Sequence, residues 1–521
     1  MLFNYLDIIR KSKRSQSALE YMMTYGWAIL IIVIVAVILY SMGIFNPSSS
    51  VTFTSSGFSP FTVSASLCNN LGYKIAVLAG PIPNNANSIT INKVFLTSAT
   101  GANTTTASYT LTSPVTLKSG QSATILIPNV ACNSANIHYS LSAKIQYSYD
   151  VPTIGLQTVN TTGTVAGTSI TGKPSTLTSY DPITITNTQS SATPSPFQQM
   201  INFTSSDPGF SSIATGNFGQ NVEFFYYNGT VIPSWLENYT SNYAIWWLKI
   251  AAIPAGSSET VYVGFAPTST NLFNTVNDGE APQLSSTYAE YDDGANVFNF
   301  YDNFKGTSLN TSKWTSGTSS GGTITVNNGI TLTYSSSSVG GAWIVGNQYF
   351  SQSSNVVFEA LFNMYGTSNF NDIRGRMYWW EQGQTSIADN NAYSIYHILS
   401  SQDYGYFTDS AIGANIANIM LPYGTLLGTL PTPSSSSDYN VMTQQILTSG
   451  SFIFNTVNYP SYSLIASKTV TGSTTDSFSP LIQASDDGSS GNTVTFNVQW
   501  VRVRAYPPNG VMPSVTFGSI S

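Results

Sequence analysis

Two patterns of hydrophobic positions divide the chain. Residues 21–45 form an apolar run without a charged side chain. As an α-helix this run would be about 37 Å long, enough to cross a hydrocarbon core of ~30 Å. From Val51 onward, hydrophobic and polar residues alternate over short stretches that end in Gly, Asn, Pro or Ser. Alternation with a period of two predicts half-buried strands, so we expect one long helix followed by a β region.

The β region is too long to enclose a single hydrophobic core, and we divide it into three β-sandwich-like domains. The first comprises residues 48–170 and the second residues 181–290, joined by a Ser/Thr/Gly/Pro-rich linker at 171–180. The third and largest comprises residues 291–521. The predicted fold class is therefore mainly β, with one long N-terminal α-helix over residues 16–47.

Charged residues are scarce and unevenly distributed. They make up 8% of the chain, against 42% hydrophobic residues, so the chain can build cores under a surface of uncharged polar side chains. Four of the 17 basic and two of the 24 acidic residues precede the apolar run, which leaves an excess of nine acidic residues after it. This acidic part has no basic stripe, which argues against nucleic acid as a partner. With few ion pairs, it should also lose little stability in acid.

A processing motif precedes the apolar run. The basic cluster favours a cytoplasmic start, with everything after the run outside the cell; it comprises Arg10, Lys11, Lys13 and Arg14. The stretch KSKRS-QSALEYMMTYGWAIL resembles the class III signal peptide of archaeal type IV pilins. The resemblance implies that residues 1–15 are a leader and that a prepilin peptidase cuts between Ser15 and Gln16. Glu20 would then be the fifth residue of the mature chain.

By the same resemblance, Glu20 would pair with the α-amine of a neighbouring subunit, and the apolar helices would pack together as a filament core. The implied partners are other pilin subunits through the N-terminal helix, the prepilin peptidase and the membrane. A single-pass membrane anchor that never polymerises explains the same segment, because an all-apolar helix suits lipid equally well. Both alternatives place the β region outside the cell, at the cell membrane or in a surface filament.

The second and third domains together resemble a known pair of domains. Residues 181–290 resemble a domain of unknown function of archaeal and bacterial surface proteins, on stretches such as NVEFFYYNGTVIPSWLENYT and AIWWLKIAAIPAGSSETVYVGFAP. In that family the domain commonly precedes a concanavalin A/laminin-G-like sandwich. Residues 291–521, which open with YDNFKGTSLNTSKW and close with VQWVRVRAYPP, fit this expectation. The fold hosts lectins, hydrolases and spacers alike, so it implies no single function.

The two cysteines, Cys68 and Cys132, predict a disulfide if the chain is exported. Two buried free thiols are the alternative. Asparagine in the N-x-Ser/Thr pattern predicts candidate N-glycosylation sites at some of six positions. They are Asn103, Asn160, Asn202, Asn228, Asn238 and Asn310.

Catalytic motifs are missing from the sequence. Concanavalin-like glycosidases place two carboxylates at alternate positions of a strand, and neither Glu359 nor Glu381 has such a partner. His138 and His397 are the only histidines, and no hydrolase motif surrounds them. We therefore predict that the protein is not an enzyme and has no cofactor, with a tethered glycoside-processing enzyme as the alternative.

Two sets of side chains could bind ligands. Tyr378, Trp379 and Trp380 offer flat rings for a glycan, because adjacent residues of a strand point to opposite faces and one tryptophan can then be exposed. The same rings would equally suit an inter-domain contact. Clustered oxygens could hold calcium, although we prefer solvated acidic turns and predict no metal site. These residues are Asp292, Asp293, Asp302, Asp486, Asp487 and Asn492.

The sequence therefore predicts a structural or adhesive pilin-like surface subunit whose C-terminal sandwich binds glycans. The first alternative is a membrane-anchored, lectin-like or envelope protein that does not polymerise.

Overall fold

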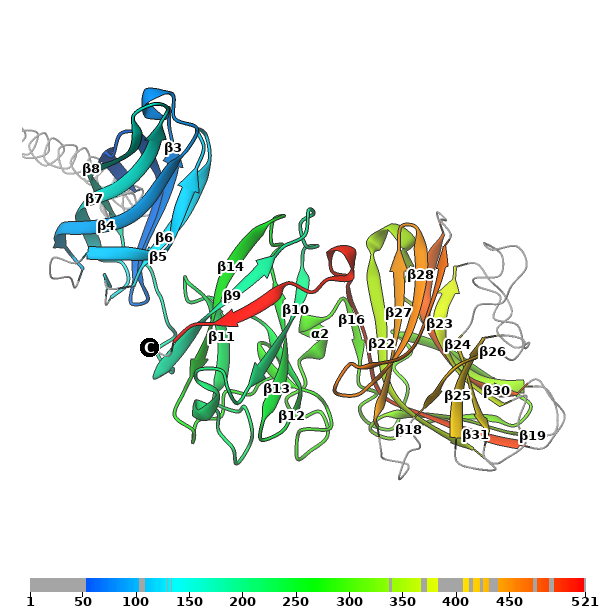
Figure 1. The fold of residues 1–521 in the computed structure, drawn as a ribbon. Coiled ribbons are helices and arrows are strands. Elements are labelled where there is room, and N and C mark those ends of the chain that lie inside the picture. The colour runs from blue at the N-terminus through cyan, green and yellow to red at the C-terminus, as the bar shows by residue number, and fades with distance from the viewer. Residues whose placement is uncertain are drawn as a thin grey trace, which may run out of the picture. The chain divides into compact units, whose positions relative to one another are not determined.

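The computed structural model describes residues 53–519 except 103–107, 129, 133, 337–339, 367–372, 383–405, 412–415, 422–424, 431–438, 472–475 and 487–491. The described residues are mainly β (Figure 1). The chain divides into two compact units, Met1–Pro174 and Ser175–Ser521.

The N-terminal unit is a sandwich of two antiparallel sheets. In its described part, a five-stranded sheet has the order β1 (Thr54–Gly57), β8 (Gly155–Thr168), β7 (His138–Val151), β4 (Ile89–Thr100) and β5 (Ser108–Leu117). The facing sheet has the order β2 (Phe61–Asn69), β3 (Gly72–Ala79) and β6 (Ser122–Ile127). Every second side chain of β7 is buried, as period-two alternation predicts, and Tyr139, Leu141 and Ile145 lie in the core.

A disulfide closes this core. Cys68 and Cys132 are both buried and bonded to each other, which confirms the predicted pair. The bridge links β2 to a segment 64 residues further along the chain.

The C-terminal unit begins with a second sandwich. One of its sheets has the order β10 (Phe197–Thr204), β13 (Tyr243–Ile250), β12 (Ser234–Tyr239) and β15 (Asp278–Glu280), in which β12 and β15 are parallel. The other has the order β11 (Val222–Tyr226), β14 (Ser257–Phe265), β9 (Ser179–Asn187) and β32 (Ser514–Phe517). β32 is the last strand of the chain, so the C-terminus returns to complete this sandwich (Figure 1).

The third sandwich is built from two larger sheets. Along its described strands, one has the order β18 (Gly322–Val326), β19 (Ile330–Ser336), β31 (Asn492–Ala505), β22 (Val356–Gly366), β27 (Val441–Thr448), β28 (Ser451–Asn458) and β29 (Leu464–Thr471), with β16 (Phe300–Asp302) beside β31. The other has the order β17 (Trp314–Ser319), β20 (Gly340–Gly346), β30 (Ser477–Asp486), β23 (Ile373–Glu381), β24 (Tyr406–Ala411), β25 (Ile416–Leu421) and β26 (Thr425–Leu430), with β21 (Phe350–Ser351) beside β30.

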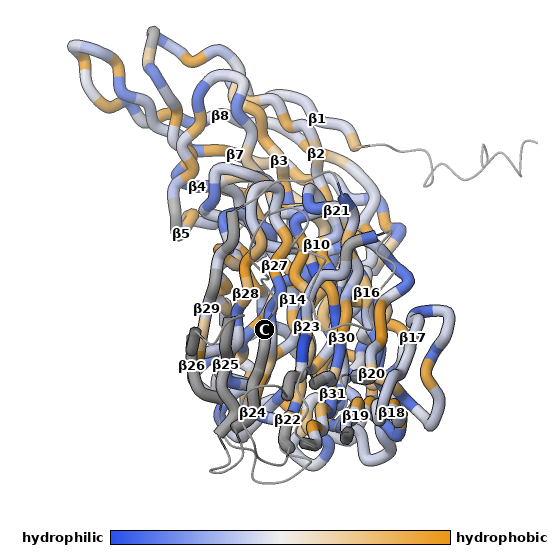
Figure 2. The backbone as a smooth tube through the Cα atoms, turned by 90° about the vertical axis from the view of Figure 1, so that its right-hand side faces the viewer, coloured by the Kyte–Doolittle hydropathy of each residue, from blue (hydrophilic) through white to orange (hydrophobic). Residues whose placement is uncertain are grey.

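The second and third sandwiches share an apolar junction. Hydrophobic residues recur along the strands (Figure 2), and those of the junction come from both sandwiches. β13 is buried on both sides: Trp246 lies in the core of the second sandwich, whereas Trp247 lies in the junction with Leu361 of β22 and Trp500 of β31. Because adjacent residues of a strand point to opposite faces, Trp246 and Trp247 pack into two different hydrophobic cores.

The structure corrects the predicted fold class. Helices are short throughout the described residues: α2 spans Gly294–Val297, and the 3-10 turns are η2 (Pro83–Asn85), η3 (Phe210–Ser212), η4 (Gln352–Ser354) and η5 (Pro508–Gly510). The prediction of one long α-helix beside the β domains is therefore wrong for the fold that the structure describes.

The predicted single-pass membrane location is corrected with it. Across the described ranges, no helix has both the length and the apolar character that a membrane crossing requires. Residues 16–47, for which the helix and anchor were predicted, lie outside the described residues, as do Ser15, Gln16 and Glu20.

Candidate functional site

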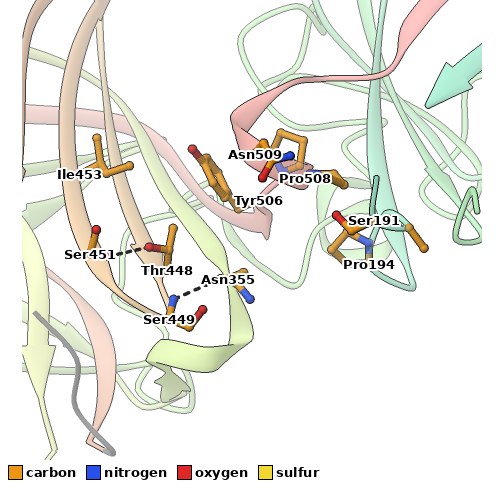
Figure 3. A pocket seen from close by; sticks show the side chains of 12 residues that line it. Ser191, Pro194, Asn355, Thr448, Ser449, Ser451, Ile453, Tyr506, Pro508 and Asn509 are labelled. Carbon is orange, nitrogen blue, oxygen red and sulfur yellow. Dashed lines mark hydrogen bonds between the residues drawn. The ribbon is translucent and has the colours of Figure 1, made fainter. Parts of the chain in front are cut away.

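A groove of about 690 Å³ lies between the second and third sandwiches of the C-terminal unit. Figure 3 shows Ser191 and Pro194 on one wall and the β27–β28 hairpin on the other, with Tyr506 and Asn509 between them. Twelve residues line the groove, and none is charged. They are Ser191, Ala192, Pro194, Asn355, Thr448, Ser449, Ser451, Ile453, Tyr506, Pro507, Pro508 and Asn509.

Hydrogen bonds hold the groove's segments together. The Asn355 side-chain oxygen accepts from the Ser449 amide at 3.2 Å, and the Asn355 carbonyl accepts from the Tyr506 amide at 2.8 Å. Asn509 takes up a left-handed conformation with φ 54°, and its side-chain nitrogen donates to Gln189 Oε1 at 3.0 Å. That last bond ties the segment after β31 to the loop that carries the opposite wall.

Several hydroxyl groups of the groove are free to bind a ligand. Among the described residues, no hydrogen bond engages the side-chain hydroxyls of Ser191, Ser449, Ser451 or Tyr506. Burial raises the pKa of Tyr506, an effect that the nearby charge of Arg504 opposes. The phenol therefore stays neutral and can both donate and accept. Neutral hydroxyls beside one aromatic ring suit an uncharged polyhydroxylated ligand.

A buried charged cluster connects the second and third sandwiches, which form the two walls of the groove. We call it the arginine centre: Arg502, Arg504, Glu237, Glu359 and Tyr462. Arg502 Nε donates to Glu359 Oε2 at 2.6 Å, and its Nη1 donates to Glu237 Oε2 at 2.8 Å. Arg504 makes a second, two-pronged contact with Glu359 at 2.8 and 3.0 Å. Glu237 belongs to the second sandwich and the other four residues to the third, so the ion pairs cross the junction.

Aromatic rings enclose the Arg502 guanidinium. Its central carbon lies 4.5 Å from the ring centroid of Trp247, 4.8 Å from Trp500 and 4.9 Å from Phe298. Trp247 also donates its indole N–H to Glu237. Charge pairing and stacking on ring faces together compensate the loss of water around a fully buried cation.

The two arginines control the ionisation of Glu359. Burial by itself would raise its pKa, but the charges of Arg502 and Arg504 outweigh this and bring the pKa to about 2. The arginine centre thus holds two cations and two acidic groups, and every atom that could react is committed to a structural contact. Its arrangement indicates a rigid connection between sandwiches.

The three aromatic residues that were predicted to bind a glycan are buried. Tyr378, Trp379 and Trp380 are 2%, 0% and 3% exposed, so none presents a ring face to solvent. Trp379 lies in the sandwich core and donates its indole N–H to the Gln445 carbonyl at 2.9 Å. Trp380 packs with Tyr378, Val345 and Leu481 on the outer side of the sheet. The expectation that one of the paired tryptophans is exposed was wrong because β23 is covered on both faces.

The candidate calcium ligands do not form a metal site among the described residues. Asp292 accepts hydrogen bonds from Trp235 Nε1, Tyr301 Oη and Asn303 Nδ2. Asp302 accepts from Trp314 Nε1 at 2.6 Å. Asp292 therefore holds an indole and a phenol group in place, and Asp302 holds an indole group. Asp487 and the side chains of Asp486 and Asn492 lie outside what the structure describes.

The candidate glycosylation sites differ in accessibility. Asn238 is half-buried, and Asn103 lies outside the described residues. The remaining four, Asn160, Asn202, Asn228 and Asn310, are exposed, so modification there remains a prediction. His138 is exposed on β7, and His397 lies outside the described residues.

The sequence interpretation missed the arginine centre and the groove. The sequence does contain a signal for the arginine centre. Glu359 lies in one strongly apolar strand, and Arg502 and Arg504 lie in another. A charged residue in such a place has to be paired. The groove has no comparable signal, because its walls come from segments more than 150 residues apart.

Comparisons with known proteins give one sequence relative. No protein-family model matches the chain. The chain is 29% identical over 364 residues, 65% of its length, to "Uncharacterized protein 562" of Sulfolobus islandicus rod-shaped virus 1. It spans 59% of the length of that relative.

Solved structures with partial similarity include a legume lectin-like domain and a carbohydrate recognition domain. The VIP36 exoplasmic/lumenal domain in its Ca²⁺/Man3GlcNAc-bound form has a TM-score of 0.26 at 11% identity, covering 39% of this chain and 94% of its own. The legume lectin-like domain from Entamoeba histolytica has a TM-score of 0.27 at 11% identity, covering 37% of this chain and 90% of its own. The Emp47p carbohydrate recognition domain has a TM-score of 0.28 at 9% identity, covering 39% and 93%.

Proposed function

We propose that this protein is a non-catalytic, lectin-like binding protein that holds a glycan in the groove between its second and third sandwiches. The observation that carries the proposal is the groove's lining: free hydroxyls, amides and one tyrosine ring, with no charged side chain. Carbohydrate hydroxyls need partners of this kind, and a pyranose face packs well on an aromatic ring. The volume of about 690 Å³ is in the range of small-molecule sites.

Rigidity of the walls supports the same function. The Arg502–Glu237 pair of the arginine centre and the Gln189–Asn509 hydrogen bond connect the parts of the chain that flank the groove. A preformed site spends little free energy on ordering its walls when the ligand arrives. The proposed ligand therefore binds without closure of one sandwich onto the other.

Binding of the full-length chain to an array of neutral and acidic glycans tests the proposal. We expect neutral glycans to bind, and we expect Tyr506→Ala to raise their Kd about tenfold, the equivalent of ~1.4 kcal/mol of lost ring contact. Tyr506→Phe keeps the ring and should retain most of the affinity. Tyr349→Ala removes another partly exposed tyrosine, 37% exposed and outside the groove, and serves as the control.

The outcome that contradicts the proposal is equally specific. If the array gives no signal, or if Tyr506→Ala and Tyr349→Ala have the same effect, the groove is not a glycan site. Turnover of a bound polysaccharide would contradict the non-catalytic assignment.

The N-terminal motif supports a separate proposal about maturation, that a prepilin peptidase cuts the chain between Ser15 and Gln16 as in type IV pilins. N-terminal sequencing of the native protein tests it. A mature chain that begins at Gln16 supports a pilin-like subunit with an adhesive groove. An intact Met1 leaves the lectin-like function without pilin assembly.

A further inference from the structure

We propose that the carboxyl groups of Asp278 and Asp293, here called the carboxyl pair, form a proton-dependent lock on the junction between the second and third sandwiches. In the closed junction both groups are neutral acids. When they ionise, the segment 278–298 loosens against the sheets on which it packs.

The first step of the argument is the absence of donors. Asp278 and Asp293 are 4% and 1% exposed. Among the described residues, no hydrogen bond from another residue reaches either side-chain oxygen of Asp293 or Oδ1 of Asp278. The other oxygen of Asp278 accepts from Asn274 Nδ2 at 3.1 Å. A buried carboxylate without compensation is highly unfavourable, so the group takes up a proton instead.

The second step is the position of Asp293 against β15, the strand that carries Asp278. The Asp293 carboxyl lies directly on Gly279, the residue next to Asp278: a side chain at position 279 would meet Asp293 Oδ1 at 2.0 Å. Burial and the charge of Glu223 raise the pKa of Asp278 to about 8. Burial and the charges of Asp292 and Asp278 raise the pKa of Asp293 well above its ordinary value.

The third step concerns the charged groups around the carboxyl pair, none of which compensates a negative charge on Asp278 or Asp293. Glu223 of β11 is itself buried and has an unpartnered side-chain oxygen, and Glu280 accepts from Ser285. The basic groups on adjoining elements are engaged elsewhere. Lys249 of β13 donates to the Asn296 carbonyl, Lys305 donates to the Ala289 carbonyl, and Arg502 of β31 binds Glu237 and Glu359.

Further acidic groups near the segment are satisfied by hydrogen bonds. Asp292 accepts from Trp235, Tyr301, Asn303 and the Gly294 amide, and burial nevertheless raises its pKa. Asp302 of β16 accepts from Trp314, and Glu237 of β12 binds Arg502. Near this segment, the buried carboxyl groups with an unpartnered oxygen are therefore those of the carboxyl pair and Glu223.

The fourth step connects the pair to the junction. Asp278 lies on β15, which pairs with β12 in such a way that Gly279 is opposite Trp235. Asp293 immediately precedes α2, and Phe298 at the end of α2 packs edge-on against Trp235 at 5.3 Å and stacks on the Arg502 guanidinium. Ionisation of the two buried, uncompensated carboxyl groups would therefore loosen β15 and the segment that leads into α2, which lie next to Trp235 and Phe298.

The sign of the pH dependence follows from the raised pKa values. Between the unfolded pKa near 4 and the folded pKa near 8, the closed form binds more protons than the opened form. The lock is therefore fully closed in acid and opens as the pH rises through about 8.

Hydrogen–deuterium exchange of the full-length chain tests the lock, with rates corrected for the intrinsic pH dependence of exchange. We expect peptides from 278–298 to exchange at least tenfold faster at pH 9 than at pH 5, because each pH unit between the opened-state pKa near 4 and the closed-state pKa near 8 shifts the equilibrium about tenfold toward the opened form. Asp278→Asn/Asp293→Asn keeps the shape without the charge and should abolish this increase. Glu259→Gln, an exposed acid of β14, should leave it unchanged.

Two results would overturn the proposal. One is a wild-type segment whose corrected exchange does not rise with pH, which decides the matter even if the double variant fails to fold. The other is protection by a cation: if millimolar Ca²⁺ suppresses exchange at pH 9 in the wild type but not in Asp293→Asn, then a metal ion and not a proton compensates the carboxyl pair.

Discussion

The guanidinium group of Arg502 is fully buried, and each of its nitrogen atoms has an acceptor: Glu359, Glu237 and the Tyr462 hydroxyl. The alternation in VQWVRVRAY predicts the strand that carries this residue, yet its two carboxylate partners lie 143 and 265 residues away in the chain. Such long-range pairing leaves no periodic signal. Sequence reasoning could predict that a charge on this strand needs a partner, but it could not identify the partner.

Replacing Arg502 by methionine should destabilise the C-terminal unit by about 3–5 kcal/mol. The change keeps an apolar side chain in the cage of rings but leaves Glu237 buried without its cation. Urea denaturation followed by tryptophan fluorescence measures the loss. Adding Glu237→Gln to Arg502→Met should recover part of it, because the second change removes the uncompensated charge.

Lys305→Met, which removes an exposed cation of the same unit and its hydrogen bond to the Ala289 carbonyl, is the matched control and should change stability by no more than about 1.5 kcal/mol. If Arg502→Met falls within that same range, the arginine centre contributes nothing to the junction.

The ion pairs of Glu359 make the stability of the folded state depend on pH in acid. Its folded pKa of about 2 lies below the unfolded value, so its ion pairs stabilise the folded state above about pH 4.5, and this contribution is lost as the pH falls through about 2. We expect the free energy of unfolding to decline below pH 4 without sharp unfolding between pH 5 and 3. Denaturation series from pH 5 to 2 measure this decline. In Glu359→Gln the decline should be shallower, and an equal slope in both proteins would refute this role.

At the scale of elements, the alternation of hydrophobic and polar residues predicted where strands lie, but it did not predict which strands pair. The pattern of β7 identifies a half-buried strand, as the structure has it. β13 has no such pattern, because both of its faces are buried, one in a sandwich core and one in the junction. β32 is the clearest case: nothing local in SVTF indicates that the chain returns past the whole third sandwich to pair with β9.

Deleting residues 512–521 should therefore destabilise the second sandwich rather than the third. The deletion exposes the edge of β9 and uncovers Phe203, whose ring stacks on Phe517 at a centroid distance of 4.5 Å. The loss of this aromatic contact alone should account for about 0.5–1.5 kcal/mol. Thermal unfolding and exchange protection of β9 measure the effect.

Phe517→Ala isolates the aromatic part of that effect, and Thr516→Ala, an exposed position on the same strand, is the control. If the truncated chain keeps wild-type protection in β9, the returning strand has no stabilising role.

At the scale of the whole molecule, the described strands form three pairs of sheets, and the chain divides into only two compact units. The sequence interpretation separated residues 181–290 from 291–521, because turn-rich stretches look alike whether or not an apolar junction follows. The structure joins these residues through the arginine centre, the aromatic junction and β32. Such an interface makes it unfavourable for one sandwich to unfold while the other stays folded.

The full-length chain should accordingly show two thermal transitions, one for each unit, and not three. Each perturbation should then move only its own transition. Reducing the Cys68–Cys132 disulfide, which closes a loop of 64 residues, should remove about 4 kcal/mol from the N-terminal unit and leave the other transition in place. Arg502→Met should do the reverse. Calorimetry with and without reductant measures both shifts, and a third transition that appears only in Arg502→Met would show that the arginine centre is what makes the second and third sandwiches unfold together. If the wild type already shows three transitions, the junction does not couple them.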